Sequence, residues 1–263
     1  MNHLIYEQVV FIGAGNVATH LSQAMQNAGY HIRQVYSRSI DNAKILAELL
    51  KCSYTNDIKN VNSNADLYIF SLADDALPAA VAAMPQNNGL WIHTAGSVPL
   101  DVFCGYTKRY GVMYPLQTFS KQRKIDFSKV PLFIEANTPD EEDMLYDVAG
   151  CLSNHVIRIT SEKRKYLHLA AVFACTFSNH LYTLAAQILG KQGVDWRLFQ
   201  PLIIESTHKL YDMSPVQAQT GPAVRDDHTI MEQHLSMLED EYMRKIYSLI
   251  SESIHTHHNK ESQ

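Results

Sequence analysis

The sequence predicts a doubly wound α/β domain over residues 1–158, followed by an all-helical region over residues 159–263. Three observations support this prediction. In the first half, short β-rich apolar runs alternate with helix-like segments, which is typical of βαβ units wound into a parallel sheet. A glycine-rich turn directly follows the first of these runs. In the second half, apolar residues recur at helical spacing.

Each strand and helix of the first half is predicted from its local pattern. Residues 8–13, QVVFIG, form a continuous apolar run of the kind that is buried on both faces of a parallel sheet. Further strands are expected at residues 31–36, 65–72 and 89–94, and helices at residues 16–27, 42–50 and 76–84. Residues 121–129 read as a polar surface loop, and the runs on either side of it are expected to extend the sheet, at residues 111–116 and 131–136.

The second half is expected to be entirely helical. Helices are predicted over residues 162–189 and 196–211, and over a last stretch from Ile230 to Ile250. The polar segment from His255 is expected to be a disordered tail. The apolar stretch 167–189 contains polar side chains that a membrane would bury at a cost in free energy. We therefore expect a buried helix of a soluble protein, with no membrane partner.

Charge and cysteine content disfavour several function classes. Lys and Arg number 22 and Asp and Glu number 27, and this net charge of −5 disfavours binding to a nucleic-acid backbone. The four cysteines are scattered without a CxxC pair, so no zinc cluster is expected. No secretory leader precedes the first predicted strand, and a cytoplasmic protein is expected.

The turn after the first strand has the pattern GxGxxA, formed by Gly13, Ala14, Gly15, Asn16, Val17 and Ala18. In a dinucleotide-binding turn, the first glycine allows the tight bend and the second lets the backbone approach a pyrophosphate. The phosphates lie at the N-terminus of the next helix, where free N–H groups and the helix dipole attract anions. We expect a dinucleotide here. A purely structural turn and an S-adenosylmethionine site are the alternatives.

The end of the second strand distinguishes between nicotinamide cofactors. NAD-preferring sites usually carry Asp or Glu there to bind the ribose 2′-hydroxyl. This sequence has Ser37, Arg38 and Ser39 instead, and a guanidinium flanked by hydroxyls suits a 2′-phosphate. We therefore expect NADP rather than NAD. In the alternative interpretation, Arg38 is a solvated loop residue and Asp41 reaches the ribose, which would favour NAD.

These motifs, together with LADDAL, HTAGSVP, YPLQTF and TGPAVRDDHTIMEQH further along, resemble those of a known family. Over nearly its whole length the chain is similar to Rossmann-like proteins with a C-terminal DUF2520 domain, often described as NADP- or coenzyme F420-dependent oxidoreductases. The sequence itself offers no support for F420. The family is in turn similar to pyrroline-5-carboxylate reductase and 6-phosphogluconate dehydrogenase. The resemblance implies a Rossmann domain, a helical domain that commonly dimerises, and hence a homodimer.

Two loops after predicted strands are candidates for contact with the cofactor, because open α/β sheets bind ligands beyond the carboxyl ends of their strands. Their candidate residues are Leu72, Ala73, Asp74, Thr94 and Gly96. The resemblance implies that these loops run beside the ribose and the nicotinamide. In the alternative interpretation, Asp74 or Asp75 caps the following helix, and Gly96 only makes a turn before Pro99.

The long predicted helix carries polar residues that suit a substrate site. Spacings of three and four place five residues along one face: Lys165, His168, Val172, Cys175 and Asn179. His168 is the candidate proton donor, because histidine ordinarily titrates near neutral pH, and Asn179 is the candidate orienting amide. The alternative is a core histidine with one hydrogen bond. β-Hydroxyacid dehydrogenases carry a catalytic lysine with an asparagine four residues later, whereas Leu169 stands at that spacing from Lys165.

A Gly/Pro loop over residues 220–227 leads into the last predicted helix. Within it, Arg225 is the candidate for bidentate binding of a substrate carboxylate, and Asp226 or Asp227 makes a natural N-cap. Tyr114, before Pro115, stands where similar proteins often have histidine. If this position touches the substrate, the acid–base chemistry of this chain differs from theirs or is lost.

The sequence thus predicts an NADP-dependent oxidoreductase that transfers hydride between the nicotinamide and a small C=O or C=N substrate held between the two domains. His168, Asn179 and Arg225 are the predicted catalytic residues. Because a fold does not fix a function, a nucleotide-binding module that regulates a partner without catalysis is the alternative. A methyltransferase is a weaker one, because it leaves Arg38 without a phosphate to bind.

Overall fold

The computed structural model describes residues 7–261. The chain divides into two compact units, Met1–Thr176 and Phe177–Gln263, which are described separately below. The predicted domain boundary between residues 158 and 159 stays a prediction. By its contacts, the segment that follows this boundary packs with the first unit, up to Thr176.

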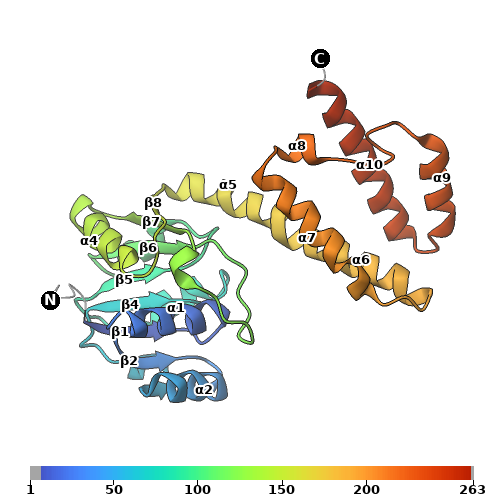
Figure 1. Ribbon diagram of the computed structural model, residues 1–263. Coiled ribbons are helices and arrows are strands. Elements are labelled where there is room, and N and C mark those ends of the chain that lie inside the picture. Colours follow the sequence, from blue (N-terminus) through green and yellow to red (C-terminus); the bar gives the residue numbers. More distant parts are fainter. Residues whose placement is uncertain (1–6, 262–263) are drawn as a thin grey trace. The chain divides into compact units, whose positions relative to one another are not determined.

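The first unit is built on one eight-stranded sheet with the strand order β3-β2-β1-β4-β5-β6-β7-β8 (Figure 1). The strands β1 to β6 pair in parallel, β7 is antiparallel to β6, and β8 is parallel to β7. Their bounds are Gln8–Ile12 (β1), His31–Tyr36 (β2), Ser53–Thr55 (β3), Leu67–Phe70 (β4), Leu90–His93 (β5), Tyr110–Pro115 (β6), Leu132–Ala136 (β7) and Val156–Arg158 (β8). The predicted α/β class and the extension of the sheet by two late strands are confirmed.

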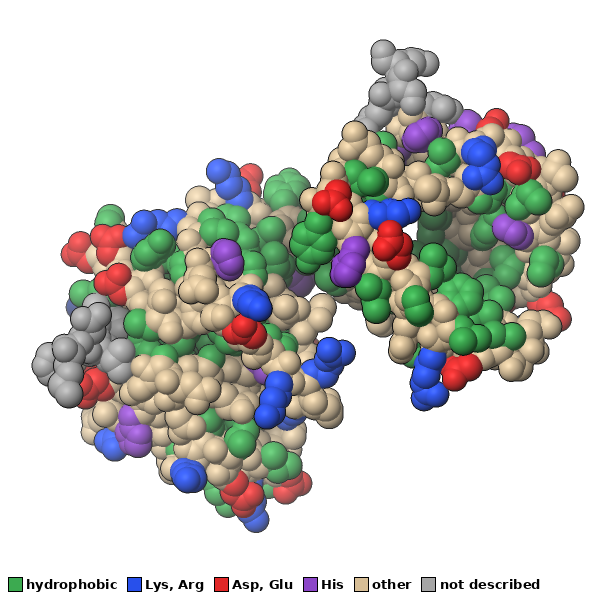
Figure 2. Space-filling model, in the orientation of Figure 1, with side chains coloured by type: hydrophobic (Ala, Val, Ile, Leu, Met, Phe, Trp, Pro, Cys, Tyr) green, Lys and Arg blue, Asp and Glu red, His purple; other side chains and the backbone are tan. Residues whose placement is uncertain are grey.

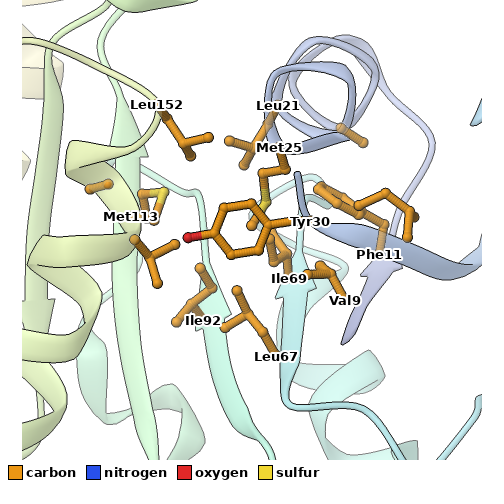
Figure 3. Packing of buried hydrophobic residues seen from close by; sticks show 14 of the residues in the cluster. Val9, Phe11, Leu21, Met25, Tyr30, Leu67, Ile69, Ile92, Met113 and Leu152 are labelled. Carbon is orange, nitrogen blue, oxygen red and sulfur yellow. The ribbon is translucent and has the colours of Figure 1, made fainter. Parts of the chain in front are cut away.

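Helices cover this sheet, and its core lies on both faces. The helices of this unit are Asn16–Asn27 (α1), Ile40–Leu50 (α2), Leu77–Ala83 (α3), Pro139–Gly150 (α4) and Ser161–Ala171 (α5). Val9 and Phe11 of β1 belong to one buried cluster, and Val10 and Ile12 to another. Side chains alternate between the two faces of a strand, which explains the uninterrupted apolar run. Figure 3 shows the first cluster around Tyr30.

The second unit consists of helices and connecting segments: Ser178–Lys191 (α6), Gln200–His208 (α7), Pro215–Ala218 (α8), His228–Met237 (α9) and Glu241–Glu261 (α10). The last predicted helix, from Ile230 to Ile250, is in fact divided between α9 and α10. The division arises because the Asp240 carboxylate accepts a hydrogen bond of 2.8 Å from the Met243 N–H and so starts a new helix. The predicted disordered tail from His255 is also wrong, because α10 continues to Glu261.

A single helix is expected over residues 162–189. The structure has three successive helical segments there: α5, a π-helical segment at Val172–Phe177, and α6. Ser161–Lys191 is long and apolar enough to cross a membrane by length and composition, which is weak evidence by itself. None of its most apolar window is buried within the described chain, so the prediction of a buried helix is wrong for the single chain. Its apolar side chains, among them Phe173 and Leu181, are exposed instead.

Candidate active site

The candidate site lies at one edge of the sheet in the first unit. After β1, the strands β2 and β3 are added on one side of it, and β4 and the later strands on the other, so the order of winding reverses between β1 and β4. In open α/β sheets, ligands bind at such a point, beyond the carboxyl ends of the strands. Because β1, β2, β4, β5 and β6 are parallel, the segments that end or follow these strands meet at this edge.

The glycine turn has the form that a pyrophosphate requires. Gly13 has a φ of +124°, and a Cβ added there would lie 2.1 Å from the backbone oxygen of Ser71, so only glycine fits. A Cβ at Gly15 would meet no atom within 4 Å, which leaves open space above the turn. Helix α1 starts at Asn16 without a side-chain cap and without an acidic residue in its first turn.

These features suit an anion. The uncapped N–H groups at the start of α1 and its positive dipole end face no carboxylate of the same turn. Ala18 is fully buried, as the close packing of this helix on the sheet requires, while Ala14 is buried and Val17 half-buried. The turn therefore fits the pyrophosphate of a dinucleotide.

Arg38 is an exposed cation at the end of β2, and within residues 7–261 it makes no ion pair. Ser37 is half-buried beside it. Ser39 is the N-cap of α2 and accepts a hydrogen bond of 3.3 Å from the Asn42 N–H, so it has a structural role as well as the predicted one. Asp41 lies in the first turn of the same helix, and the NAD alternative stays open.

The loops after β4 and β5 are joined to each other. The Ser97 hydroxyl donates to the Asp74 carboxylate, and the Thr94 hydroxyl lies 3.3 Å from the Ser71 hydroxyl. Helix α3 has Ala76 as its N-cap and no side-chain cap, so the alternative that Asp74 or Asp75 caps it is wrong. Leu72 is half-buried and Ala73 exposed in the same loop.

A buried histidine anchors the second loop. His93, the last residue of β5, is fully buried, and its Nδ1 accepts a hydrogen bond of 3.2 Å from the Ala95 N–H. Burial and then the nearby Arg164 guanidinium lower the pKa of His93 to about 3. The imidazole is therefore neutral at physiological pH and acts as a hydrogen-bond acceptor for the loop.

A buried ion pair that the sequence analysis did not anticipate joins helix α5 to β7, and a hydrogen bond of the same arginine joins the helix to this loop. Arg164 is fully buried, and one guanidinium nitrogen donates to the Glu135 carboxylate at 2.6 Å. The other donates to the Val98 carbonyl, also at 2.6 Å. Ser161, in the first turn of α5, donates to Glu135 and accepts from the Leu100 N–H. An arginine four residues before His168, on the same helix face, was the available signal.

The side chain of His168 lies against Gly96 and Tyr114. Its Nδ1 is 3.1 Å from the Tyr114 hydroxyl, and the two rings meet edge to face with centroids 5.9 Å apart. A Cβ at Gly96 would lie 2.6 Å from the same nitrogen, so only glycine leaves room for the His168 ring here. Gly96 therefore does more than make a turn before Pro99. Burial and then Asp74 raise the pKa of Tyr114.

Asn179 and Arg225 belong to the second unit, and both are exposed. Asn179 lies in the first turn of α6, and Arg225 precedes α9. Asp227 caps α9 by accepting a bond of 3.2 Å from the Ile230 N–H, which confirms the structural role predicted for one of the two aspartates. The π-helical segment interrupts the α-helical spacing that predicted a single face from Lys165 to Asn179. The structure thus brings His168 to the sheet edge, while the roles of Asn179 and Arg225 stay predictions.

Comparison with known proteins shows the family of this chain. Residues 8–92 match the family described as NADP oxidoreductase, coenzyme F420-dependent, and residues 130–254 match the domain of unknown function DUF2520. A Bacteroides fragilis protein of known structure, named a "putative NADP oxidoreductase", is 45% identical with a TM-score of 0.90. The match covers 95% of this chain and 98% of that one.

More distant structures share the fold. The 1-pyrroline-5-carboxylate reductase of Streptococcus pyogenes is 13% identical with a TM-score of 0.64, over 95% of this chain and 98% of that one. An imine reductase of Myxococcus stipitatus, solved with NADP+, is 15% identical with a TM-score of 0.65, over 96% and 93%. No curated protein matches this chain. The chain belongs to the family that joins an NADP oxidoreductase domain of the coenzyme F420-dependent type to a DUF2520 domain.

Proposed function

We propose that this protein is an NADP-dependent oxidoreductase that acts on a small C=O or C=N substrate. The observation that carries the proposal is the pairing of an uncapped α1 N-terminus at Gly15 with Arg38, which follows the adjacent strand β2 and makes no ion pair within residues 7–261. The first supplies N–H donors for a pyrophosphate, and the second supplies a cation for a 2′-phosphate. The bound cofactor supplies the hydride.

The residues of the chain provide binding and a proton. Gly13 and Gly15 keep the turn open for the phosphates, and the joined loops that carry Asp74 and Gly96 border the same edge of the sheet. His168 donates the proton that the substrate heteroatom takes up when the double bond is reduced. Arg225 and Asn179 of the second unit are proposed to bind and orient the substrate, with Arg225 on a carboxylate.

Calorimetric titration with NADPH, NADH and S-adenosylmethionine tests the cofactor. We expect NADPH to bind in the micromolar range, and Arg38→Ala to weaken it by about ten- to a hundredfold, the worth of one or two charge-assisted hydrogen bonds. Arg33→Ala is the matched control, because Arg33 is an exposed arginine on β2, the strand that precedes Arg38. If none of the three compounds binds, the oxidoreductase proposal is wrong.

Turnover with a panel of carbonyl and imine acids tests the chemistry. We expect His168→Ala to lower kcat by about a hundredfold or more while the Kd for NADPH stays unchanged. Arg225→Ala should mainly raise KM for substrates with a carboxylate. NADPH binding without turnover of any substrate would favour a regulatory nucleotide-binding module.

We also propose that the protein is a cytoplasmic homodimer, in which a second copy covers the helical unit. Apolar side chains there are widely exposed, including Leu202, Tyr242 and Leu249. Figure 2 shows hydrophobic side chains around a hollow in this unit, and a space of about 400 Å³ is lined by α6, α9 and α10. Apolar surface of this extent favours association, and most soluble oligomers are symmetric homo-oligomers.

A further inference from the structure

A tyrosine and a histidine meet at the carboxyl edge of the sheet, although they lie far apart in the sequence. Tyr114 is the last residue but one of β6, before Pro115, and His168 lies in α5, 54 residues later. The Tyr114 ring packs in a small apolar cluster with Val112 and Phe133, which fixes its orientation. Its hydroxyl lies 3.1 Å from His168 Nδ1, within hydrogen-bond distance.

The partners of the two nitrogens of His168 differ. Nδ1 faces Tyr114 and Gly96, while Nε2 makes no hydrogen bond within the described residues of a side chain that is only half-buried. Nδ1, the inner nitrogen, is therefore held by the protein, and Nε2, the outer nitrogen, is left for a ligand.

The backbone around this pair is fixed from two sides. Arg164, one helical turn before His168, joins α5 to the loop after β5 through the Val98 carbonyl. Gly96 in that loop leaves room for the imidazole and nothing larger than hydrogen at its own Cα. Neither contact reaches the outer nitrogen of His168.

We propose that Tyr114 is a positioning residue that holds Nδ1 of His168, so that Nε2 is the atom that delivers a proton to the substrate. This inference rests on the proposed oxidoreductase function. A phenol hydroxyl has one donor and two acceptor sites, so it bonds Nδ1 whether that nitrogen carries a proton or not. Tyr114 thus keeps the ring in place through both charge states of His168.

The proton step balances as follows. As the C=O or C=N carbon takes hydride from NADPH, the substrate heteroatom takes the proton from Nε2 of the imidazolium. The Nε2–H bond breaks, its electron pair stays on the ring, and an O–H or N–H bond forms on the product. The neutral ring keeps its other proton on Nδ1, which donates a hydrogen bond to the Tyr114 oxygen, and solvent then returns a proton to Nε2.

We assign the proton to His168 and the positioning role to Tyr114, whose hydroxyl bonds, within the described residues, only Nδ1 of that histidine. Burial, Asp74 and Cys175 all raise the pKa of its phenol, so a tyrosinate is an unfavourable product of proton transfer. The phenol therefore acts on the substrate through His168.

A double-mutant cycle tests the proposal in the full-length protein. We expect Tyr114→Phe to lower kcat about tenfold, the kinetic equivalent of one hydrogen bond, without a change in the Kd for NADPH. In a His168→Ala background, Tyr114→Phe should have no further effect, because it acts only through the histidine. Equal effects of Tyr114→Phe in both backgrounds would show a merely structural role and overturn the proposal.

A spectroscopic readout separates this inference from the proposed function. With 15N-labelled histidine, Tyr114→Phe should shift the His168 Nδ1 resonance, while Tyr110→Phe, a half-buried tyrosine on the same strand, should leave it in place. An unchanged Nδ1 signal in Tyr114→Phe, in protein that still binds NADPH, overturns the inference and leaves the oxidoreductase proposal standing. Failure of NADPH to bind overturns the proposed function, whatever the resonance does.

Discussion

The two units of this protein bury their apolar side chains very differently. The buried hydrophobic residues of the first unit fill three clusters on its sheet. Within the described part of the second unit, Ala223 alone is buried. Yet the sequences of both units show regular apolar patterns. A pattern therefore indicates which face of a helix is apolar, but not whether the same chain covers it.

The largest effect should come from charging the exposed apolar face of the second unit. Leu249 is 68% exposed and Ile45, in α2 of the first unit, is 63% exposed, so they form a matched pair. Light scattering should give a dimer for the wild type and for Ile45→Asp, and a monomer for Leu249→Asp, because only Leu249 loses apolar contacts with a second copy. A monomeric wild type at all concentrations would contradict the dimer.

Breaking the buried ion pair should have the next largest effect, and it tests how firmly α5 belongs to the first unit. Arg164→Leu leaves the Glu135 carboxylate without its cation and should lower the free energy of unfolding by about 3–5 kcal/mol. Arg158→Leu removes an exposed arginine from its partners Glu142 and Asp143 and should cost less than about 1 kcal/mol. Chemical denaturation measures both. Equal costs would mean that α5 is not held by Arg164.

Acid should destabilise the first unit through His93. The unfolded histidine takes up a proton below about pH 6.5, whereas the folded one resists down to a pKa of about 3. The free energy of unfolding is therefore unaffected by His93 above about pH 6.5. As the pH falls from about 6.5 to about 3, it decreases by about 1.4 kcal/mol per pH unit. His93→Gln should show a shallower decline. Acidic groups elsewhere act in both proteins, so identical slopes would exclude a neutral buried His93.

The smallest effect on stability should come from replacing a glycine by alanine, and it should differ between a glycine of the first unit and one of the second. Gly96→Ala forces a methyl group against the His168 ring and should cost about 1–3 kcal/mol in stability. Gly190→Ala, in α6, meets no atom within 4 Å and should stabilise the protein by up to about 1 kcal/mol. Thermal unfolding of the two variants provides the measurement. A neutral Gly96→Ala would mean that His168 can move away from the loop.

Long buried strands could be predicted from sequence, because burial on both faces of the sheet requires a continuous run of apolar residues. The run QVVFI is β1, and the predicted strand at residues 31–36 is β2. The strands β3 and β8 could not be predicted, because each has three residues that are exposed or half-buried. The antiparallel direction of β7 also leaves no signal in its own residues.

The candidate site was predicted where its residues are neighbours in sequence. The glycine turn and Arg38 follow a local pattern, and the structure gives them a suitable geometry. The contact of Glu135 with Arg164 joins residues 29 positions apart, and a charged residue is ordinarily expected at the surface. Such pairs depend on the tertiary fold, so neither their burial nor their role can be predicted from a local pattern.

The reversal of β7 and β8 has a consequence for how such a protein can evolve. These strands run antiparallel to the others, so the chain leaves β8 pointing away from the carboxyl edge. Helix α5 then runs back toward that edge and brings His168 to Tyr114, at the edge where the glycine turn lies. The candidate cofactor contacts come from residues 13–96, whereas the proposed proton donor and substrate ligands come from residues 168–225. Under the proposed function, exchange of the chain from Tyr114 onward would replace the proton donor together with its partner tyrosine and leave the glycine turn and Arg38 in place.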